Sequence, residues 1–175
     1  YAFASTQLRT NPEGDDRERD VCVKCGFVNY LNPKVVVGAV STWEDKILLV
    51  KRAIQPQKGY WTIPAGFLEM EETIEEGAVR ETWEEANARI QIDCILGIYN
   101  ITRISQIYIV YRANMLSQSL SPGYESLDAK LFTFNPLPVA KFFITKKLFF
   151  LKILIELYIF FIVSFICMKS LISWP

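Results

Sequence analysis

The feature that most limits what this chain can fold into is a tract rich in glutamate, residues 66–88. It reads GFLEMEETIEEGAVRETWEEANA and holds eight glutamates but only one basic residue. Thr73 and Glu76 form the capping-box pattern that begins a helix. Asn87 is typical of the left-handed residue that ends one. The tract therefore predicts a single capped, acidic helix over residues 74–86.

Apolar runs rich in β-branched residues flank this tract on both sides. Residues 34–42 and 46–54 are two such runs joined by a short polar turn, which predicts an antiparallel pair of strands. Shorter or more broken runs predict further strands over residues 59–67, 88–101, 106–115 and 130–134. One acidic helix among these strands predicts an α+β fold with mixed β-sheets.

The glutamates of the predicted helix fall into two groups. Glu75 and Glu76 lie in the first turn, where the helix dipole favours a negative charge by about 0.3 to 1 kcal/mol each. Glu81, Glu84 and Glu85 lie in the second half, where the dipole opposes them. Glu81 and Glu85 are also an i,i+4 pair of like charge, which costs about 0.2 to 0.5 kcal/mol. The second group therefore needs a reason that the helix itself does not supply.

A divalent cation would supply this reason, because Mg²⁺ prefers carboxylate, water and phosphate oxygens. On a helical wheel the three carboxylates share one face with Gly77, whose missing side chain we expect to leave the approach to them open. The apolar side chains occupy the adjoining face, with Ala78, Val79, Thr82, Trp83 and Ala86. The alternative interpretation is a solvated charged surface without a function.

The composition excludes several kinds of chemistry. The chain has no histidine, which excludes Ser-His-Asp and Cys-His nucleophiles and every imidazole metal site. Its 19 basic residues balance its 19 acidic ones, so no overall field attracts nucleic acid or an anionic membrane. We therefore predict no nucleic-acid partner, and the electrostatics of any site must be local.

The N-terminal part contains half of a metal site. Residues 1–20 are polar and show neither helix nor strand periodicity, which predicts a linker. Cys22 and Cys25 then form a C-x-x-C pair, which is half of a structural zinc site. Cys94 and Cys167 have the wrong spacing to complete it, so Zn²⁺ is expected only if the missing ligands are supplied. Two unligated thiols are the alternative. This cysteine usage favours a reducing compartment.

An apolar tail, residues 142–175, differs abruptly in composition from the rest of the chain. Residues 148–168 have the length of a membrane span, but Lys152 and Glu156 interrupt them and leave only residues 157–168 uncharged. We consider three interpretations: a membrane tail anchor, a buried terminal helix, and translated A/T-rich noncoding DNA. The last fits a tail rich in Phe, Ile, Leu and Lys that lacks Gly, Ala, Asp and Arg.

The glutamate tract resembles the Nudix box, G-x5-E-x7-R-E-U-x-E-E-x-G-U, in which U is a bulky aliphatic residue. Six of its seven fixed positions match, at Gly66, Glu72, Arg80, Glu81, Glu84 and Glu85. The departures are Thr82, Asn87 and Ala88. We expect Thr82 and Ala88 to loosen the packing and Asn87 to shift the loop after the helix, but no carboxylate is lost.

The likeness extends from about Asp15 to Phe134. The segments CVKCGFVNYLNPKVVVGAV, GYWTIPAGFLE, GAVRETWEEA and PGYESLDAKLF together resemble the plant chloroplast FAD and ADP-ribose pyrophosphatase subgroup of Nudix hydrolases. In that subgroup a zinc ribbon precedes the catalytic domain. The expected organisation is a linker with a partial zinc ribbon over residues 1–33, a Nudix domain over 34–141 and the apolar tail.

This resemblance implies a Nudix α/β/α sandwich that uses Mg²⁺ or Mn²⁺ to hydrolyse a nucleoside diphosphate linked to another group. The implied small-molecule substrates are FAD, split into FMN and AMP, and ADP-ribose, split into AMP and ribose 5-phosphate. A chloroplast location is implied, without a visible transit peptide, and cytoplasmic or tail-anchored locations are alternatives. A homodimer is also expected. The alternative function is a noncatalytic nucleotide-binding module, tethered to a membrane through residues 148–168.

The same resemblance implies the residue roles. Catalysis and metal binding are assigned to Glu81, Glu84, Glu85 and the backbone carbonyl of Gly66. One of these carboxylates, or a residue of a later loop, would deprotonate the attacking water. Glu72 and Arg80 would hold the carboxylates in register through an ion pair. Glu125 is a candidate further ligand or a plain turn residue. Three aromatic residues are candidates for stacking on the base or for the core: Tyr60, Trp61 and Tyr108.

Overall fold

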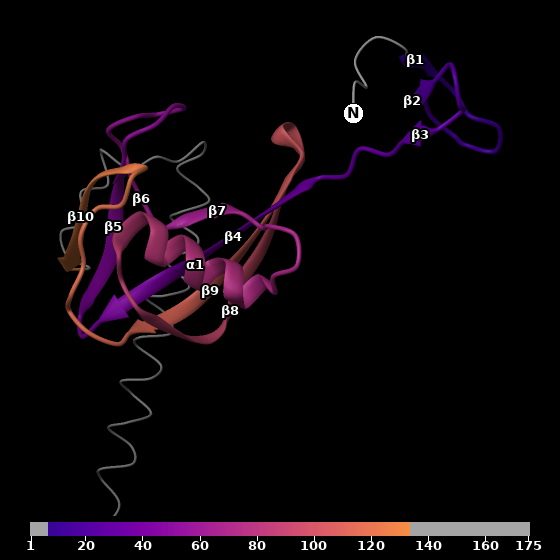
Figure 1. Cartoon of the computed structure of the whole chain (residues 1–175). Coiled ribbons are helices and arrows are strands. Elements are labelled where there is room, and N and C mark those ends of the chain that lie inside the picture. Colours follow the sequence, from indigo (N-terminus) through magenta and orange to yellow (C-terminus); the bar gives the residue numbers. More distant parts are fainter. Residues whose placement is uncertain (1–6, 134–175) are drawn as a thin grey trace, which may run out of the picture. The chain divides into compact units, whose positions relative to one another are not determined.

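The computed structural model describes residues 7–133. They belong to two compact units that meet at the bond between Pro33 and Lys34 (Figure 1). The first unit is a small sheet, and the second unit contains the acidic helix on a larger sheet.

The N-terminal unit is a three-stranded antiparallel sheet in the order β1-β2-β3. Its strands are β1 (Gln7–Thr10), β2 (Arg19–Cys22) and β3 (Val28–Asn29). The expected linker over residues 1–20 is therefore wrong for residues 7–20, where β1 pairs with β2. No residue of this sheet is buried, so neither face needs an apolar side chain at every second position. That is why the strand periodicity is missing from the sequence.

A tight turn joins β2 to β3 and carries the C-x-x-C pair. Gly26 has a φ of +72°, which glycine adopts without a steric penalty. The Gly26 N–H donates to the carbonyl of Cys22 over 2.9 Å, and the Cys22 N–H donates to the carbonyl of Phe27 over 2.8 Å. Cys22 is half-buried in this turn and Cys25 is exposed.

The second unit is built on a seven-stranded mixed sheet. Its elements are β4 (Lys34–Trp43), β5 (Lys46–Arg52), β6 (Trp61–Thr62), β7 (Ala65–Phe67), α1 (Ile74–Ala86), β8 (Ile90–Ile101), a 3-10 helix (Thr102–Ile104), β9 (Gln106–Met115) and β10 (Ser126–Thr133). The order is β10-β5-β4-β9-β8, with β6 alongside β5 and β7 alongside β4. β4 and β9 are parallel, and the other neighbours are antiparallel.

β4 and β5 form the predicted antiparallel pair, but only beside their turn, where Thr42 lies opposite Ile47. Beyond this point the two strands part. β7 then takes the vacated edge of β4, with Gly66 opposite Val37, and β6 pairs with β5. The parting of the strands therefore places Gly66 in the sheet, close to the residues that α1 covers.

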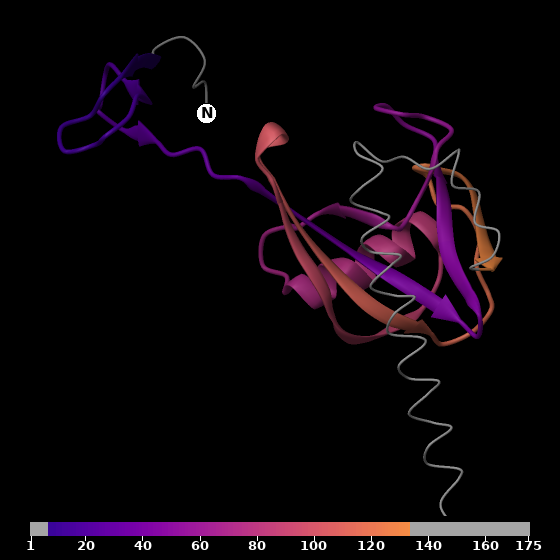
Figure 2. The same cartoon turned by 180° about the vertical axis from the view of Figure 1, so that it is seen from behind.

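The core lies on both faces of the sheet. α1 crosses one face, and Figure 2 shows the molecule from behind (Figures 1 and 2). One buried cluster joins Ala78 and Ala86 of α1 to strand residues that include Val37, Ala39, Leu48, Val50, Tyr111 and Ala113. A second cluster contains Val40, Ile47, Leu49, Trp61, Ile63 and Val110. Consecutive residues of β5 thus alternate between the two clusters, which explains why its apolar run is unbroken.

The observed architecture confirms an α+β fold with a mixed sheet and one acidic helix. Residues 7–133 contain a single α-helix, so the second helical layer of the expected sandwich is not seen in this part of the chain. No helix within these residues is long and apolar enough to cross a membrane. The apolar tail over 142–175 lies outside the described residues.

Candidate active site

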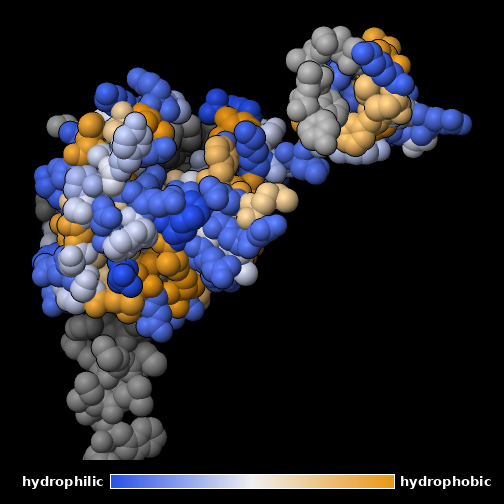
Figure 3. Space-filling view, viewed as in Figure 1, coloured by the Kyte–Doolittle hydropathy of each residue, from blue (hydrophilic) through white to orange (hydrophobic). Residues whose placement is uncertain are grey.

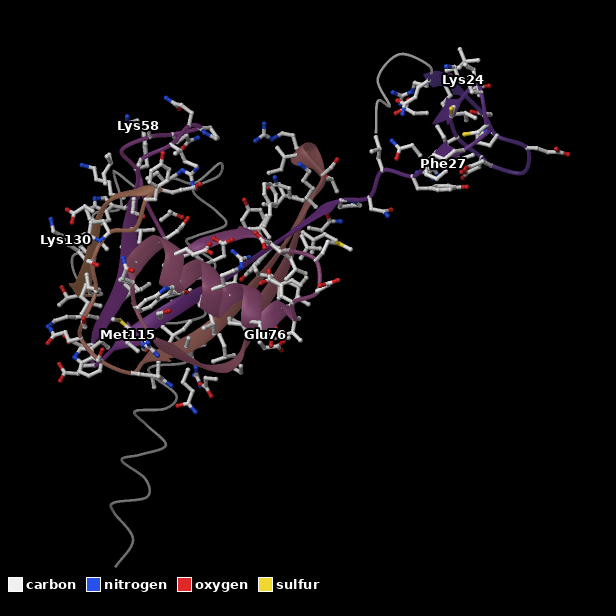
Figure 4. The ribbon with its side chains drawn as sticks, in the orientation of Figure 1. Lys24, Phe27, Lys58, Glu76, Met115 and Lys130 are labelled. Atoms are coloured by element: carbon white, nitrogen blue, oxygen red, sulfur yellow. The ribbon has the colours of Figure 1, made fainter. Side chains whose placement is uncertain are left out.

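The acidic helix begins and ends at the predicted residues. Thr73 Oγ1 accepts a hydrogen bond from the Glu76 N–H (3.1 Å), and the Glu76 carboxylate accepts one from the Thr73 N–H (2.8 Å). Figure 4 shows Glu76 at this start of α1. At the other end Asn87 is left-handed, with a φ of 48°, and its N–H donates to the Trp83 carbonyl. Asparagine therefore takes the conformation expected of the glycine in the box.

The face that α1 buries differs from the predicted one. The buried residues are Gly77, Ala78, Glu81, Thr82, Glu85 and Ala86. Val79 and Trp83, which were expected on the apolar face, are 36% and 45% exposed. The hydroxyl of Thr82 donates to the Ala78 carbonyl over 2.8 Å, so this polar atom is satisfied inside the core. Two of the glutamates, Glu81 and Glu85, therefore face the sheet.

Gly77 has a packing role rather than the open approach that was expected of it. A Cβ at this position would lie 2.8 Å from Cγ2 of Val37 and 2.9 Å from Oε1 of Glu72. Both distances are shorter than a normal contact between such atoms. Gly77 therefore allows α1 to lie close to β4, which in turn sets the depth of the two buried glutamates.

Gly66 brings the backbone of β7 against the carboxylate of Glu81. A Cβ at Gly66 would lie 2.3 Å from Oε1 and 2.4 Å from Oε2 of Glu81. The Glu81 carboxylate therefore occupies the space that any other side chain at residue 66 would need. Glu81 is only 9% exposed, and its burial raises its pKa, although a hydrogen bond from Arg80 acts in the opposite direction.

Glu85 is buried one turn further along the helix and is 8% exposed. Its Oε2 accepts a hydrogen bond from the Ala65 N–H over 3.3 Å. Burial, followed by the charge of Glu81, raises the pKa of Glu85 to about 8. Two carboxylates thus lie together at the sheet surface, where burial disfavours the ionised form of each.

Arg80 and Glu72 form the expected ion pair. Nη2 and Nε of Arg80 donate to the two carboxylate oxygens of Glu72 over 2.7 and 2.9 Å, which is a bidentate arrangement. Glu72 also accepts the Glu69 N–H (2.7 Å), and Arg80 Nη2 donates to the Phe67 carbonyl (3.0 Å). The hydrogen bonds of Arg80, followed by that of Glu69, lower the pKa of Glu72 to about 2. This pair fastens the loop between β7 and α1 to the helix.

Arg80 also contacts two of the predicted metal ligands. Its Nη1 donates to Oε1 of Glu81 over 2.8 Å and to Oε2 of Glu84 over 3.0 Å. Glu84 is exposed and lies at the rim of the site, whereas Glu81 is buried. One guanidinium therefore holds Glu72 with one edge and two box carboxylates with the other.

The carboxylates are close to one another but are not arranged as a metal site. Within residues 7–133, no three histidine, cysteine, aspartate or glutamate side chains form a group that could hold a metal ion. Glu81 and Glu84 face Arg80, and Glu85 faces the Ala65 N–H. The donor chemistry nevertheless fits a divalent cation, because two buried carboxylates repel each other and oxygen is the ligand that Mg²⁺ prefers.

The loop between β9 and β10 packs on the C-terminal end of α1. Its Ser121 N–H donates to the Ala86 carbonyl (2.9 Å), and its Gly123 N–H donates to the Glu85 carbonyl (3.0 Å). A Cβ on Gly123 would lie 1.6 Å from the carbonyl oxygen of Glu84. The loop thus satisfies carbonyls that the helix end leaves without partners.

Glu125 lies in the same loop and is exposed. Its carbonyl accepts the Ala53 N–H over 2.8 Å. Burial is the largest cause of the raised pKa of Glu81 and Glu85, and the Glu125 charge contributes a smaller increase to both. Glu125 is therefore near enough for its charge to act on the site, and its role as a metal ligand stays a prediction.

The three candidate stacking residues have different surroundings. Trp61 is 8% exposed and packs edge to face on Phe132, with ring centroids 4.8 Å apart, so it belongs to the core. Tyr108 is half-buried, and its burial raises its pKa. Tyr60 is 43% exposed. Tyr60 is therefore the most accessible of the three.

Three contributors to the site were missed in the sequence. They are the Ala65 N–H, the guanidinium of Arg52 and the backbone of Gly123. Arg52 acts through its charge, which lowers the pKa of Glu85 against the larger effect of burial. Gly123 follows a proline in a predicted turn and could have been noticed. The positions of the Ala65 N–H and the Arg52 guanidinium depend on strand pairing, which no local sequence pattern predicts.

Two family matches agree with this geometry. The NUDIX domain family matches residues 32–147, and the Nudix N-terminal zinc-ribbon family matches residues 5–31. The second match also fits the small sheet that replaces the expected linker. Both matches support the resemblance to Nudix proteins, and neither bears on the chloroplast subgroup.

Individual relatives are similar over most of this region. The chain is 36% identical to an ADP-ribose pyrophosphatase of Methanocaldococcus jannaschii, over 65% of this chain and 69% of that protein. It is 30% identical to the NAD-capped RNA hydrolase NudC of Photobacterium profundum, over 65% of this chain but only 42% of that protein. A crystal structure of a NUDIX hydrolase from Nitrosomonas europaea matches with a TM-score of 0.79 and 43% identity, covering 83% of both chains. Because the NUDIX match spans more than half of its length, this chain belongs to the Nudix hydrolase family.

Proposed function

We propose that this chain is a divalent-metal-dependent pyrophosphohydrolase that splits a nucleoside diphosphate linked to another group. The observation that carries the proposal is the pair of buried carboxylates, Glu81 and Glu85, held against the backbone of β7 at Ala65 and Gly66. Burying two like charges side by side is costly unless a cation joins them. A stable fold that retains such a pair therefore favours a metal-binding role.

Glu81, Glu84, Glu85 and the carbonyl of Gly66 would hold Mg²⁺ or Mn²⁺. When bound, such an ion neutralises phosphate charge and activates a water for attack on phosphorus. Arg80 keeps the helix and the preceding loop in register through Glu72, and it donates to one oxygen each of Glu81 and Glu84. The Ala65 N–H orients Glu85. Which carboxylate takes the proton of the water stays open among these residues and Glu125.

ADP-ribose is the substrate that we propose first, with AMP and ribose 5-phosphate as products. The support is the similarity to the Methanocaldococcus jannaschii protein, which is named an ADP-ribose pyrophosphatase. FAD, split into FMN and AMP, is the second proposed substrate and rests on the resemblance to the plant subgroup. Tyr60 is the proposed stacking residue for the base, because it is exposed and Trp61 is not. The chloroplast location stays a prediction.

The test is AMP release by the full chain with Mg²⁺. The chain would be incubated with ADP-ribose or FAD, and AMP would be measured by chromatography, with and without a chelator. We expect AMP from at least one substrate, and we expect the chelator and Glu85→Gln to abolish it. Nucleotide binding without any product would instead support a noncatalytic module. Unchanged turnover in Glu85→Gln would refute the assigned ligands.

A further inference from the structure

The end of β5 is held at both of its edges by segments that carry an exposed tyrosine. At one edge, the Arg52 N–H donates to the Tyr60 carbonyl over 2.9 Å. At the other edge, the Ala53 N–H donates over 2.8 Å to the carbonyl of Glu125, the residue after Tyr124. Figures 1 and 2 both show the loop after β5 and the start of β10 at the same end of the second unit. Tyr60 and Tyr124 therefore belong to segments that flank one strand end.

Tyr124 occupies the corner of a tight turn beside the acidic helix. The Ser126 N–H donates to the Gly123 carbonyl over 3.1 Å, which closes a turn with Tyr124 as one of its two central residues. The Gly123 N–H donates to the Glu85 carbonyl over 3.0 Å. A Cβ on Gly123 would have no room against the carbonyl oxygen of Glu84. The turn is therefore fixed on the helix that carries the box carboxylates.

The backbone before Tyr60 is fixed by the loop that joins β5 to β6. The Nε of Arg52 donates to the Pro56 carbonyl over 3.1 Å. The Gly59 N–H donates to the Arg52 carbonyl over 2.8 Å. Arg52 thus holds this loop through its side chain and its backbone. The position of Tyr60 at the strand end therefore does not depend on its own side chain.

Neither tyrosine is part of the buried core. Tyr124 is 97% exposed and Tyr60 is 43% exposed, whereas Trp61 is buried. Figure 3 shows strongly hydrophilic side chains across the middle of the face that carries α1. Such a surface suits a diphosphate and its metal ion, but it offers little to a flat, weakly polar base. Aromatic contacts for a base must therefore come from the rim of the site.

We propose that Tyr60 and Tyr124 form a clamp that holds the base of the substrate between their rings. Adjacent strands lie about 4.8 Å apart, so the segments on the two sides of β5 are separated by about 10 Å. A base stacked between two rings needs about 7 to 8 Å from ring to ring, because carbon atoms in contact are about 3.5 to 4.0 Å apart. The strand spacing therefore leaves room for one base.

The clamp deepens the proposed function and rests on it. Adenine is the base that ADP-ribose and FAD share, so one clamp serves both proposed substrates. Every base offers a flat face for stacking, and stacking alone discriminates little between bases. The clamp therefore selects a nucleoside diphosphate over a sugar diphosphate or an inorganic one. Tyr124 is the specificity residue that this inference adds to Tyr60.

The test is calorimetric titration of the full chain with AMP or ribose 5-phosphate in the presence of Mg²⁺. AMP contains the base and ribose 5-phosphate does not. Tyr124→Ala should weaken AMP binding about 5- to 150-fold, the range for losing one stacked aromatic ring, and should leave ribose 5-phosphate binding unchanged. Tyr124→Phe keeps the ring and should bind AMP almost normally. In turnover, Tyr124→Ala should raise the KM for ADP-ribose by a similar factor and change kcat little.

Leu116→Ala is the matched control, because Leu116 is 60% exposed at the other end of the same loop. It should leave AMP binding unchanged. Normal AMP binding by Tyr124→Ala, or an equal loss of ribose 5-phosphate binding, would overturn the clamp. Failure of the unaltered chain to bind AMP would overturn it too. A chain that binds AMP in the expected way but releases none from ADP-ribose or FAD would keep the clamp and remove the proposed function.

Discussion

The two halves of α1 are built from the same acidic residue and use it in opposite ways. In the first half, Glu76 completes the capping box, and Glu75 accepts a hydrogen bond from the hydroxyl of Tyr111 over 2.9 Å. In the second half, Glu81 and Glu85 are buried against the sheet. Both pairs have hydrogen-bond donors, but the helix dipole favours the first pair and opposes the second, which is also buried. Glutamates of one acidic tract therefore differ through their burial, which raises the pKa of Glu81 and Glu85, and not through their residue type.

The largest expected effect is on turnover, and it distinguishes the second half of α1 from the first. Glu85→Gln should lower turnover at least about 100-fold, because the loss of mere supporting partners around a metal already costs about 10 to 100-fold. Glu76→Gln is the matched control in the first half, since glutamine also serves in a capping box. Steady-state AMP release would compare them. Equal losses in both variants would contradict the division.

The second effect concerns the space that Gly66 leaves for Glu81. Gly66→Ala would place a Cβ 2.3 Å from Oε1 of Glu81, so the carboxylate must move. Because a side-chain end can shift cheaply, we expect nearly unchanged thermal stability but turnover lower by about 10 to 100-fold. Gly97→Ala, whose Cβ would lie nearest to the side chain of Tyr99, is the control. Normal turnover in Gly66→Ala would show that the carboxylate position does not matter.

The third effect is that of Glu85 on the free energy of unfolding of the metal-free protein. The folded-state pKa of Glu85 is about 8, above its ordinary value of 4.5, so the folded protein holds this proton more tightly than the unfolded chain. Glu85 therefore destabilises the metal-free protein progressively as pH rises from 4.5 to 8. Glu85→Gln should raise the free energy of unfolding by on the order of 1 to 3 kcal/mol near pH 8, and hardly at all below pH 4.5. Urea titrations would measure it.

The exposed Glu84 provides the matched comparison for that experiment. Glu84→Gln should change the free energy of unfolding by less than about 1 kcal/mol, because exposed ion pairs contribute little. A gain in Glu84→Gln as large as in Glu85→Gln would show that general charge reduction, and not burial, is responsible.

The fourth effect tests the ion pair that joins the helix to the preceding loop. Glu72→Gln should lower turnover about tenfold, because Arg80 would lose its bidentate partner. The pKa of Glu72 is lowered from 4.5 to about 2, so its ionised form stabilises the fold above pH 4.5, and this contribution disappears as pH falls towards 2. The stability difference from the unaltered chain should shrink over the same range. Glu69→Gln, which leaves the Glu69 N–H in place, should behave normally.

The smallest effect belongs to the first half of the helix. Thr73→Ala should cost about 1 kcal/mol of stability, since the hydroxyl accepts the Glu76 N–H at the helix start. Thr73→Ser keeps that hydroxyl and should restore most of the loss. Neither change touches a box carboxylate, so the turnover number should stay the same. Thermal unfolding and AMP release would together check this prediction, and a drop in turnover with Thr73→Ser would contradict it.

Much of the local structure could be predicted. The capping box, the left-handed Asn87 and the ion pair between Glu72 and Arg80 all involve residues close in the chain. The small sheet of the N-terminal unit could not, because its strands bury nothing and so carry no apolar alternation. The helical wheel also predicted Val79 and Trp83 on the buried face, whereas both are exposed. The sequence of a helix alone does not show which of its faces the sheet covers.

The position of the acidic helix, its caps and the carboxylates that it carries follow from residues close together in the chain. The burial of Glu81 and Glu85, and the exposure of Glu84, depend instead on how the helix packs on the sheet. The separation of β4 from β5, which brings Gly66 against Glu81, likewise depends on the long-range pairing of strands. The two kinds of feature differ in the sequence separation over which their interactions act. The capping hydrogen bonds and the helix dipole act within a few residues, whereas burial depends on which distant strands pair beneath the helix.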